Sequence, residues 1–372
     1  MIRILIVDDS AFMRKALSMM LEGDPEIRVV DTARDGLEAL EKVRRLRPDV
    51  VTLDIEMPRM DGLTALRQIM QEHPCPVIMI SSLTREGAQA TLEALNAGAV
   101  DFIPKQLSFV SLEIAKIKEE LIAKIKAIAA SRAKLFRQPS PAKPAPSPGP
   151  SRPETPLVYR RARLLAIGVS TGGPAALQYV IPHLPADLPV PVAVVQHMPP
   201  HFTQSLANRL DKLSPLEVVE AEDGMELRPG RVIIAAGGRH LVFQAREAGT
   251  VVATPDHPET LHRPSVDVMF TSAADVFQGR VLATVMTGMG QDGRAGATAI
   301  RRRGGKIVAQ DESSCVVYGM PRAVVEAGLA DAVVPLDELA ATLTQALTGL
   351  SDRPLSFPRM PSVSRDPLPD RP

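Results

Sequence analysis

The sequence predicts two α/β domains, each built around a largely parallel sheet and joined by a proline-rich linker. Three observations support this fold class. Apolar, strand-like runs alternate with helical patterns in two separate blocks, near residues 1–136 and 158–350. Between the blocks, residues 139–156 contain eight prolines and almost no large apolar side chains. The chain has 372 residues, which at roughly 150 residues per domain fits two domains with connecting sequence.

The composition places the domain boundaries. We expect a first domain over residues 1–136, a linker over 137–157, a second domain over 158–350 and a tail over 351–372. The tail contains six prolines mixed with Arg, Ser and Asp, so it is predicted to be disordered. With 45% hydrophobic residues overall, each domain has enough apolar side chains to bury a core.

The first block contains five apolar runs with strand character, separated by segments of helical periodicity. The predicted strands are residues 2–7, 27–31, 50–54, 77–81 and 100–103. The predicted helices are residues 11–21, 37–45, 62–71 and 86–97. Five strands alternating with helices indicate a doubly wound, five-stranded parallel sheet. A longer helix is predicted to follow, because apolar residues from 114 to 128 recur close to helical spacing.

The second block alternates in the same way and predicts an α/β domain with a mostly parallel sheet. The predicted strands are residues 164–169, 192–196, 231–235, 281–287 and 306–309. The predicted helices are residues 174–181, 203–213, 266–276, 294–302, 322–327 and 336–348. Residues 217–252 have the character of hairpins and turns.

Composition and charge exclude several classes of function. Forty-three basic residues balance 43 acidic ones, and no basic stretch is interleaved with aromatics, so we expect no nucleic-acid partner. The N-terminal apolar run meets two aspartates at once, unlike a signal peptide, and no run approaches the roughly 18 residues that span a bilayer. Cys75 and Cys315 lie far apart without metal-binding spacing. We therefore expect a cytoplasmic monomer that does not insert into membranes.

Polar residues stand where the predicted strands of the first domain end. Asp8 and Asp9 follow the first strand, Asp54 ends the third, Ser81 ends the fourth and Lys105 lies just past the fifth. The carboxyl ends of parallel strands meet at one edge of a sheet. Three carboxylates at such an edge suit a hard divalent cation, and Mg²⁺ prefers oxygen ligands. A carboxylate beside Mg²⁺ and a lysine is equipped to attack a phosphoryl donor.

Three strand ends of the second domain supply the residues of a serine hydrolase. Ser170 lies in GVSTGGP, a G-x-S-x-G turn between a strand and a helix, which by itself is about as often structural as nucleophilic. His197 ends the strand at 192–196 and is the preferred base, whereas the other histidines of this domain lie in loops and are expected to be solvated. Asp292 follows the strand at 281–287 and is placed to orient the histidine.

Two other interpretations compete with a hydrolase. Residues 288–293 read G-x-G-x-x-G after a strand, with Asp311 about 20 residues on, as in a dinucleotide-binding site. Against this, Asp292 would place a negative charge inside the loop that cradles a pyrophosphate. The second alternative is a phosphorylation-gated binding module without catalysis. A DNA-binding output domain is poorly supported, because no basic recognition helix is evident.

The first domain resembles the response-regulator receiver domain, which has a flavodoxin-like fold, over residues 1–105. The resemblance implies that Asp54 is phosphorylated by a histidine kinase and that Mg²⁺ is held by Asp8, Asp9 and Asp54. It also implies three switch residues, which are Ser81, Phe102 and Lys105.

The motifs GVSTGGP, VQHMP and TGMGQDG closely resemble the catalytic domain of the chemotaxis protein-glutamate methylesterases of the CheB family, over about residues 160–350. The resemblance implies that Ser170 is the nucleophile, His197 the general base and acid, and Asp292 its orienter. It also implies that Thr171 helps to position the histidine and that the Met289 N–H contributes to an oxyanion hole.

The activity implied by this resemblance is the hydrolysis of glutamyl methyl esters on chemoreceptors, with deamidation of receptor glutamines by the same route. The esterase chemistry needs no cofactor, and the phosphodonor is the chemotaxis histidine kinase. A receiver tethered to a hydrolase leads to a further hypothesis. The unphosphorylated receiver is expected to pack over the edge that carries Ser170 and to block access, and phosphorylation of Asp54 is expected to loosen that packing.

Overall fold

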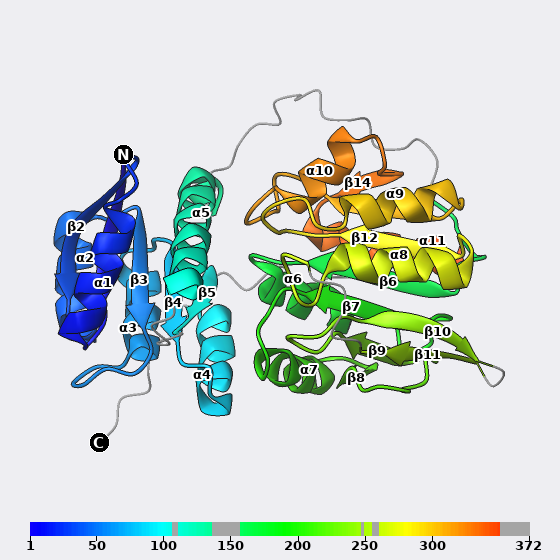
Figure 1. The fold of residues 1–372 in the computed structure, drawn as a ribbon, viewed down its shortest axis with the longest axis horizontal. Coiled ribbons are helices and arrows are strands. Elements are labelled where there is room, and N and C mark those ends of the chain that lie inside the picture. Colours follow the sequence, from blue (N-terminus) through cyan, green and yellow to red (C-terminus); the bar gives the residue numbers. More distant parts are fainter. Residues whose placement is uncertain (106–110, 136–156, 247–248, 255–259, 350–372) are drawn as a thin grey trace, which may run out of the picture.

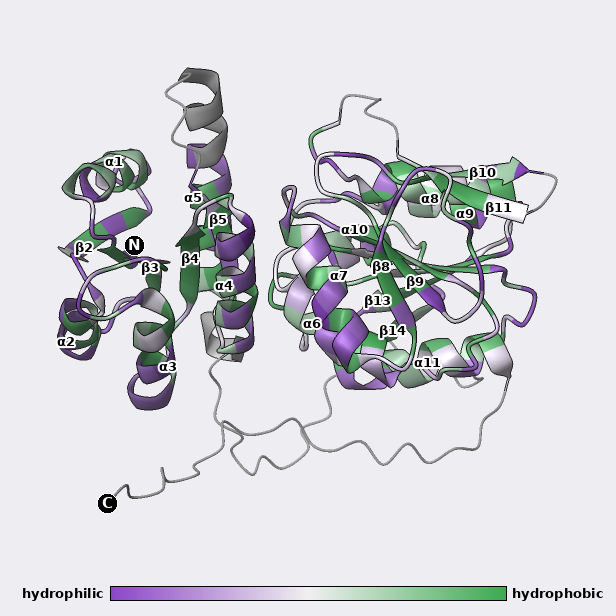
Figure 2. Cartoon of the chain, turned by 90° about the horizontal axis from the view of Figure 1, so that it is seen from below, coloured by the Kyte–Doolittle hydropathy of each residue, from purple (hydrophilic) through white to green (hydrophobic). Residues whose placement is uncertain are grey.

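The computed structural model describes residues 1–105, 111–135, 157–246, 249–254 and 260–349 (Figure 1). The predicted linker, apart from Leu157, and the predicted tail lie outside these residues. Two α/β domains stand side by side, and the helices α4 and α5 of the first domain lie between its sheet and the second domain. Strands at the centre of both domains are mainly hydrophobic (Figure 2).

The first domain is the five-stranded parallel sheet that the sequence predicts, with strand order β2-β1-β3-β4-β5. Its strands are β1 (Ile2–Val7), β2 (Ile27–Ala33), β3 (Val50–Asp54), β4 (Val77–Ser81) and β5 (Asp101–Pro104). Its helices are α1 (Ala11–Leu21), α2 (Gly36–Leu46), α3 (Gly62–Glu72), α4 (Arg85–Asn96) and α5 (Ser111–Leu135).

The first four helices begin where the sequence supplies a capping side chain. In each case the capping oxygen accepts a hydrogen bond from the backbone N–H three residues on, which satisfies one of the unpaired donors of the first turn. The capping residues are Ser10, Asp35, Asp61 and Thr84. The chain therefore leaves each strand through a polar turn, and these turns place side chains at the carboxyl edge of the sheet.

The second domain is built on a seven-stranded parallel sheet with order β14-β13-β12-β6-β7-β9-β8. Its strands are β6 (Leu164–Val169), β7 (Val192–Gln196), β8 (Glu217–Glu220), β9 (Arg231–Ile234), β12 (Val281–Val285), β13 (Lys306–Gln310) and β14 (Ala332–Val334). Its helices are α6 (Gly173–Val180), the 3-10 turn η1 (Ile181–His183), α7 (Phe202–Leu213), α8 (Val266–Phe277), α9 (Arg294–Arg302), α10 (Met320–Glu326) and α11 (Leu336–Thr348). The predicted α/β fold class is confirmed.

The region expected to form hairpins is only partly a hairpin. The strands β10 (Val242–Arg246) and β11 (Gly249–Ala253) pair antiparallel, but β8 and β9 join the main sheet as parallel neighbours. The segment between β8 and β9 reaches over to β11 through a bridge from Glu226 to Val251, so the chain re-enters the sheet in the same direction. A pattern of short strands and turns does not distinguish antiparallel from parallel pairing, because the pairing depends on the path of the connection between the two strands.

The two domains share apolar packing along the faces of α4 and α5. The Phe102 ring of β5 stacks on the Phe202 ring at the start of α7, with centroids 4.6 Å apart and an interplanar angle of 4°. Leu121 and Ile125 of α5 lie in one buried cluster with Val317 of the second domain, and Met289 packs against that cluster. Among the described residues, no helix is both long and apolar enough to cross a membrane.

Candidate active site

Three adjacent strands of the second sheet bring the predicted hydrolase residues to one edge. In the sheet order, β12 lies beside β6 and β6 lies beside β7. Ser170 follows β6, His197 follows β7, and the loop after β12 carries Asp292. All three strands run in the same direction, so their carboxyl ends open onto a single edge, as expected for an α/β sheet.

The three side chains form a continuous hydrogen-bonded chain. The Nδ1 atom of His197 lies 3.1 Å from Ser170 Oγ, and its Nε2 atom lies 2.7 Å from Asp292 Oδ2. A carboxylate only accepts, so Nε2–H donates to Asp292 and leaves Nδ1 free to accept the Ser170 hydroxyl. The His197 and Asp292 side chains are 9% and 10% exposed, so this chain is largely shielded from water.

The turn around Ser170 requires glycine at Gly172. Its backbone has a φ of +77°, and a Cβ there would lie 2.6 Å from Val316. The chain then enters α6, and Pro174 lies in the first turn of this helix. This local geometry projects the Ser170 side chain toward His197 from a strand-to-helix elbow.

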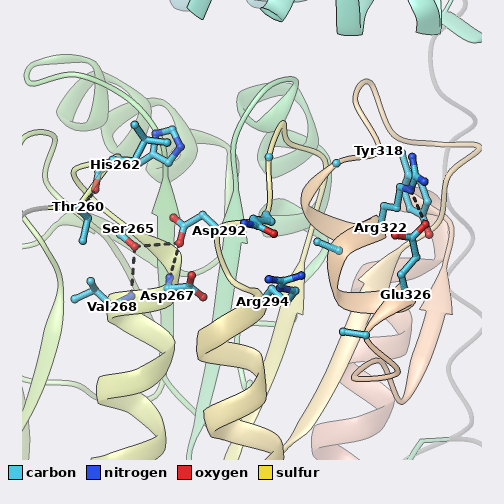
Figure 3. Close-up of a pocket in the computed structure, with 16 residues that line it drawn as sticks. Thr260, His262, Ser265, Asp267, Val268, Asp292, Arg294, Tyr318, Arg322 and Glu326 are labelled. Carbon is cyan, nitrogen blue, oxygen red and sulfur yellow. Dashed lines mark hydrogen bonds and ion pairs between the residues drawn. The ribbon is translucent and has the colours of Figure 1, made fainter. Parts of the chain in front are cut away.

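The carboxylate of Asp292 is held by the N-terminus of α8. Its Oδ1 atom accepts hydrogen bonds from the Ser265 hydroxyl at 3.0 Å and the Asp267 N–H at 2.8 Å (Figure 3). Its Oδ2 atom accepts one from the Val266 N–H at 2.7 Å. Burial alone would raise the pKa of Asp292, but His197 and these backbone donors outweigh it and hold that pKa well below its usual range. Asp292 is therefore ionised whenever His197 needs a counter-charge.

The role of the α8 N-terminus was not predicted from the sequence. Helix α8 was expected at 266–276, and the capping Ser265 before an apolar helix was the available signal. What the sequence does not show is that this N-terminus points at a carboxylate 27 residues further along. The neighbouring Asp267 has its pKa raised by burial and by the charge of Asp292, so Asp292 is the member of this pair that keeps its charge.

Gln196 is a second residue that the sequence reasoning missed. Its side-chain amide donates to the backbone carbonyl of Ser170 at 3.0 Å and to that of His197 at 3.1 Å. The side chain is 2% exposed. Gln196 thus ties the Ser170 turn to the His197 turn.

Thr171 and Met289 lie next to the serine. The Thr171 hydroxyl is buried and, among the described residues, makes no hydrogen bond, so the structure brings it beside Ser170 without a bond to His197. Gly288 packs directly on Ser170, since a Cβ at Gly288 would lie 2.8 Å from the Ser170 Cβ. Met289 follows immediately, which puts its backbone at the mouth of the serine turn.

The expectation that the remaining loop histidines are solvated is wrong for His240, which is 1% exposed. His262 is half-buried. The His262 ring lies flat on the His197 ring, with centroids 4.1 Å apart and an interplanar angle of 19°. Neither position could be found from local sequence, because each depends on which element packs above the loop.

An open pocket of about 910 Å³ adjoins Asp292. It is lined on one side by Thr260, His262 and Asp267 and on the other by Arg294, Tyr318 and Arg322 (Figure 3). Arg322 is paired with Glu326 at 2.7 Å. The pocket supplies both apolar and charged surface next to the histidine and aspartate.

The carboxyl edge of the first sheet brings together the predicted acidic residues. Oxygen atoms of Asp8, Asp9 and Asp54 lie within 4.8 Å of one another, close enough to share one cation. Lys105 Nζ lies 2.6 Å from Asp54 Oδ2 and 3.1 Å from Asp8 Oδ2. A cavity of about 200 Å³, which includes Ser81 in its lining, opens beside these groups.

The electrostatics of this edge favour the entry of a cation. Burial raises the pKa of Asp54 to about 6, and the charge of Asp8 adds to this although Lys105 opposes it. A divalent ion between the carboxylates would remove that repulsion. The donor set of three carboxylates is therefore chemically suited to Mg²⁺.

The other two residues predicted to act as a switch, Ser81 and Phe102, lie in different places. The Ser81 hydroxyl is buried and donates to the Gly87 carbonyl at 3.1 Å, near the start of α4. Phe102 is 4% exposed and forms the stack with Phe202 between the two domains. Phe102 of β5 therefore contacts α7, the helix that follows the His197 turn.

The alternative of a dinucleotide-binding loop at residues 288–293 is not favoured by the structure. Gly288 packs on Ser170, and the Asp292 carboxylate binds His197 and the N-terminus of α8. This agrees with the objection that a carboxylate there opposes a pyrophosphate.

Comparison with known proteins matches both domains. The response regulator receiver domain model matches residues 4–116, and the CheB methylesterase model matches residues 165–343. The "Protein-glutamate methylesterase/protein-glutamine glutaminase 2" of Nitratidesulfovibrio vulgaris is 50% identical over 93% of this chain and 100% of its own length. The similarly named protein of Symbiobacterium thermophilum is 50% identical over 93% of this chain and 97% of its own.

A solved structure is also similar, the crystal structure of the Thermotoga maritima CheB methylesterase catalytic domain. It is 43% identical, covers 50% of this chain and 98% of its own, and has a TM-score of 0.49. With half of all positions identical along nearly the whole chain in the relatives above, this chain belongs to the CheB family, in which a receiver domain precedes a methylesterase domain.

Proposed function

We propose that this chain is a phosphorylation-activated protein-glutamate methylesterase that hydrolyses glutamyl methyl esters on chemoreceptors, and that it also deamidates receptor glutamines. The observation that carries the proposal is the hydrogen-bonded chain from Ser170 through His197 to Asp292. The relatives that match this protein are named for both activities.

The geometry supports acyl transfer through a covalent glutamyl-enzyme. The Ser170 hydroxyl attacks the side-chain ester carbonyl while His197 Nδ1 accepts its proton. The imidazolium is stabilised by Asp292 at Nε2, and its proton then passes to the departing methoxide, which leaves as methanol. Water, activated by the same histidine, hydrolyses the acyl-enzyme to glutamate and restores the Ser170 hydroxyl.

The oxyanion of each tetrahedral intermediate needs backbone donors near Ser170. We assign one of these to the Met289 N–H, because Gly288 packs on Ser170 and Met289 follows it at the mouth of the turn. Deamidation of a glutamine follows the same path, with the proton of His197 delivered to the amide nitrogen, which leaves as ammonia.

The receiver edge supports phosphorylation of Asp54 by a histidine kinase. Asp8, Asp9 and Asp54 would hold Mg²⁺, which supplies neutralisation of charge on the transferring phosphoryl group. Lys105 lies in contact with Asp54 and provides a fixed counter-charge. Ser81 and Phe102 are assigned as the switch pair that responds to the phosphoryl group.

The contacts between the domains support inhibition of the esterase by the unphosphorylated receiver. Leu121 and Ile125 of α5 belong to the apolar cluster against which Met289 packs, beside the Ser170 turn. Phe102 stacks on Phe202 at the start of α7. A bulky receptor helix therefore meets the receiver at the edge where the nucleophile lies.

The proposed function is tested by methanol release from methylated receptor membranes, measured with and without Mg²⁺ and a small phosphodonor. We expect stimulation of about tenfold, the usual size of a coupling between two sites. Asp54→Ala should keep the unstimulated rate and lose the stimulation, as should wild type in excess EDTA. Glu41→Ala, which removes an exposed carboxylate of α2 in the same domain, is the matched control. Absence of methanol release from every receptor tested would reject the esterase.

Removal of the receiver tests the inhibitory contact. A variant that lacks residues 1–136 should release methanol without phosphodonor about tenfold faster than the full chain, because the edge beside Met289 is uncovered. Circular dichroism and thermal melting establish that the shortened chain is folded. A folded variant whose rate equals that of the unphosphorylated full chain would refute inhibition by the receiver.

A further inference from the structure

The catalytic histidine has a neighbour to which no role has been assigned. His262 precedes α8 by a short loop, and its ring lies on the face of the His197 ring at a centroid distance of 4.1 Å and an angle of 19°. The same residue lines the pocket beside Asp292 (Figure 3). Two imidazole rings are therefore stacked at the candidate active site.

Both ring nitrogens of His197 make hydrogen bonds, so a further residue can contact only the faces of its ring. Nδ1 contacts Ser170 and Nε2 contacts Asp292. Hydrogen bonds at two edges still permit the ring to tilt about the line that joins them. A flat ring pressed on one face opposes that tilt, and a small misorientation at a proton-transfer centre has a large effect on rate.

His262 is uncharged in the neutral pH range. Burial, with smaller contributions from the charges of His197 and of Lys124 on α5, lowers the pKa of His262 to about 4. Asp292 and Glu120 of α5 act in the opposite direction and do not reverse the shift. His197 therefore meets a neutral π face when it takes the proton of Ser170, and a cation is attracted to such a face.

We propose that His262 is a positioning residue for the esterase reaction. Its neutral ring holds His197 in the orientation that serves both Ser170 and Asp292, and it stabilises the imidazolium that forms in every proton transfer. This inference rests on the proposed function, because it assigns His262 a part in that same acyl transfer.

Three substitutions separate the flat shape of the ring from its neutrality. His262→Phe keeps a flat, uncharged ring and should retain kcat within about threefold. His262→Ala removes the ring and should lower kcat by about tenfold with an unchanged KM. His262→Arg stacks a planar group of fixed positive charge on His197 and should lower kcat by about 100-fold.

The pH profile supplies a measurement that a purely structural role would not change. In His262→Arg the fixed charge disfavours protonation of His197 in the resting enzyme, so the acidic fall of kcat/KM should move to lower pH than in wild type. In His262→Phe the profile should coincide with that of wild type above about pH 5, because neither ring is charged there. The control is His183→Ala, which removes a half-buried imidazole at the far end of α6 from Ser170.

The experiment uses the full chain, saturated with Mg²⁺ and phosphodonor, on methylated receptor membranes. A kcat for His262→Ala within twofold of wild type would overturn the inference, and so would a rise in KM with kcat unchanged, which would make His262 a substrate contact. Equal losses in the Phe, Ala and Arg variants would also overturn it. If wild type releases no methanol at all, the proposed function fails. If Ser170→Ala is inactive and all three His262 variants keep the wild-type kcat, only the role of His262 fails.

Discussion

Ser170→Ala is expected to lower the rate of methanol release by about 10⁴-fold or more, since removal of a hydrolase nucleophile leaves only the contribution of binding and oxyanion donors. The Ser170 hydroxyl is the group that His197 Nδ1 faces at 3.1 Å, so its removal leaves the histidine without the hydroxyl that it would deprotonate. Because Ala fits the space of Ser, the fold should be unaffected.

The measurement is kcat/KM for methanol release by wild type, by Ser170→Ala and by a matched control, Ser272→Ala. Ser272 lies on α8 in the same domain, and its hydroxyl accepts a hydrogen bond from the Phe243 N–H at 2.8 Å. We expect the control to stay within about twofold of wild type, since it lies away from the reacting groups. A Ser170→Ala variant that keeps a tenth or more of wild-type activity would require another nucleophile.

Asp292→Asn should produce the second largest loss, about 10³- to 10⁴-fold in kcat, with little change in KM. The carboxylate accepts from His197 Nε2 at 2.7 Å and so keeps Nδ1 free to act as the base. An amide nitrogen at this position would donate to the histidine instead, which favours the tautomer that cannot accept the Ser170 proton. The imidazolium would also lose its counter-charge.

Asp292 should also contribute to stability, because it receives hydrogen bonds from Ser265, Val266 and Asp267 at the N-terminus of α8. We expect Asp292→Asn to lower the free energy of unfolding by roughly 2–4 kcal/mol at pH 7. The folded pKa of Asp292 lies below its unfolded value, so this contribution is present above about pH 4 and is lost as the pH falls further.

Urea unfolding of wild type and Asp292→Asn at pH 7 and below pH 4 tests this expectation. The difference between the two proteins should shrink at the acidic pH. Ser265→Ala serves as a companion variant, because it removes one donor to Asp292 but leaves the carboxylate in place. A stability difference that is independent of pH would mean that the charge of Asp292 is not what α8 stabilises.

The residues that can meet at each sheet edge are predictable from the sequence. Alternation of strands and helices requires parallel sheets, and parallel strands deliver their following residues to one side, so Ser170, His197 and Asp292 were predictable from their places after three strands. The same reasoning placed Asp8 and Asp54 together in the receiver. The resemblance of short motifs then assigned the chemistry that position alone left open.

Only the tertiary structure decided what surrounds those residues. The α8 N-terminus that holds Asp292, the His262 ring on His197 and the stack of Phe102 on Phe202 all join segments that are remote in sequence. Local periodicity reports whether a side chain faces a core, but it does not report which element lies across that core. The support of the catalytic histidine and the contact between receiver and esterase are therefore properties of packing, because they arise only when distant elements are brought together.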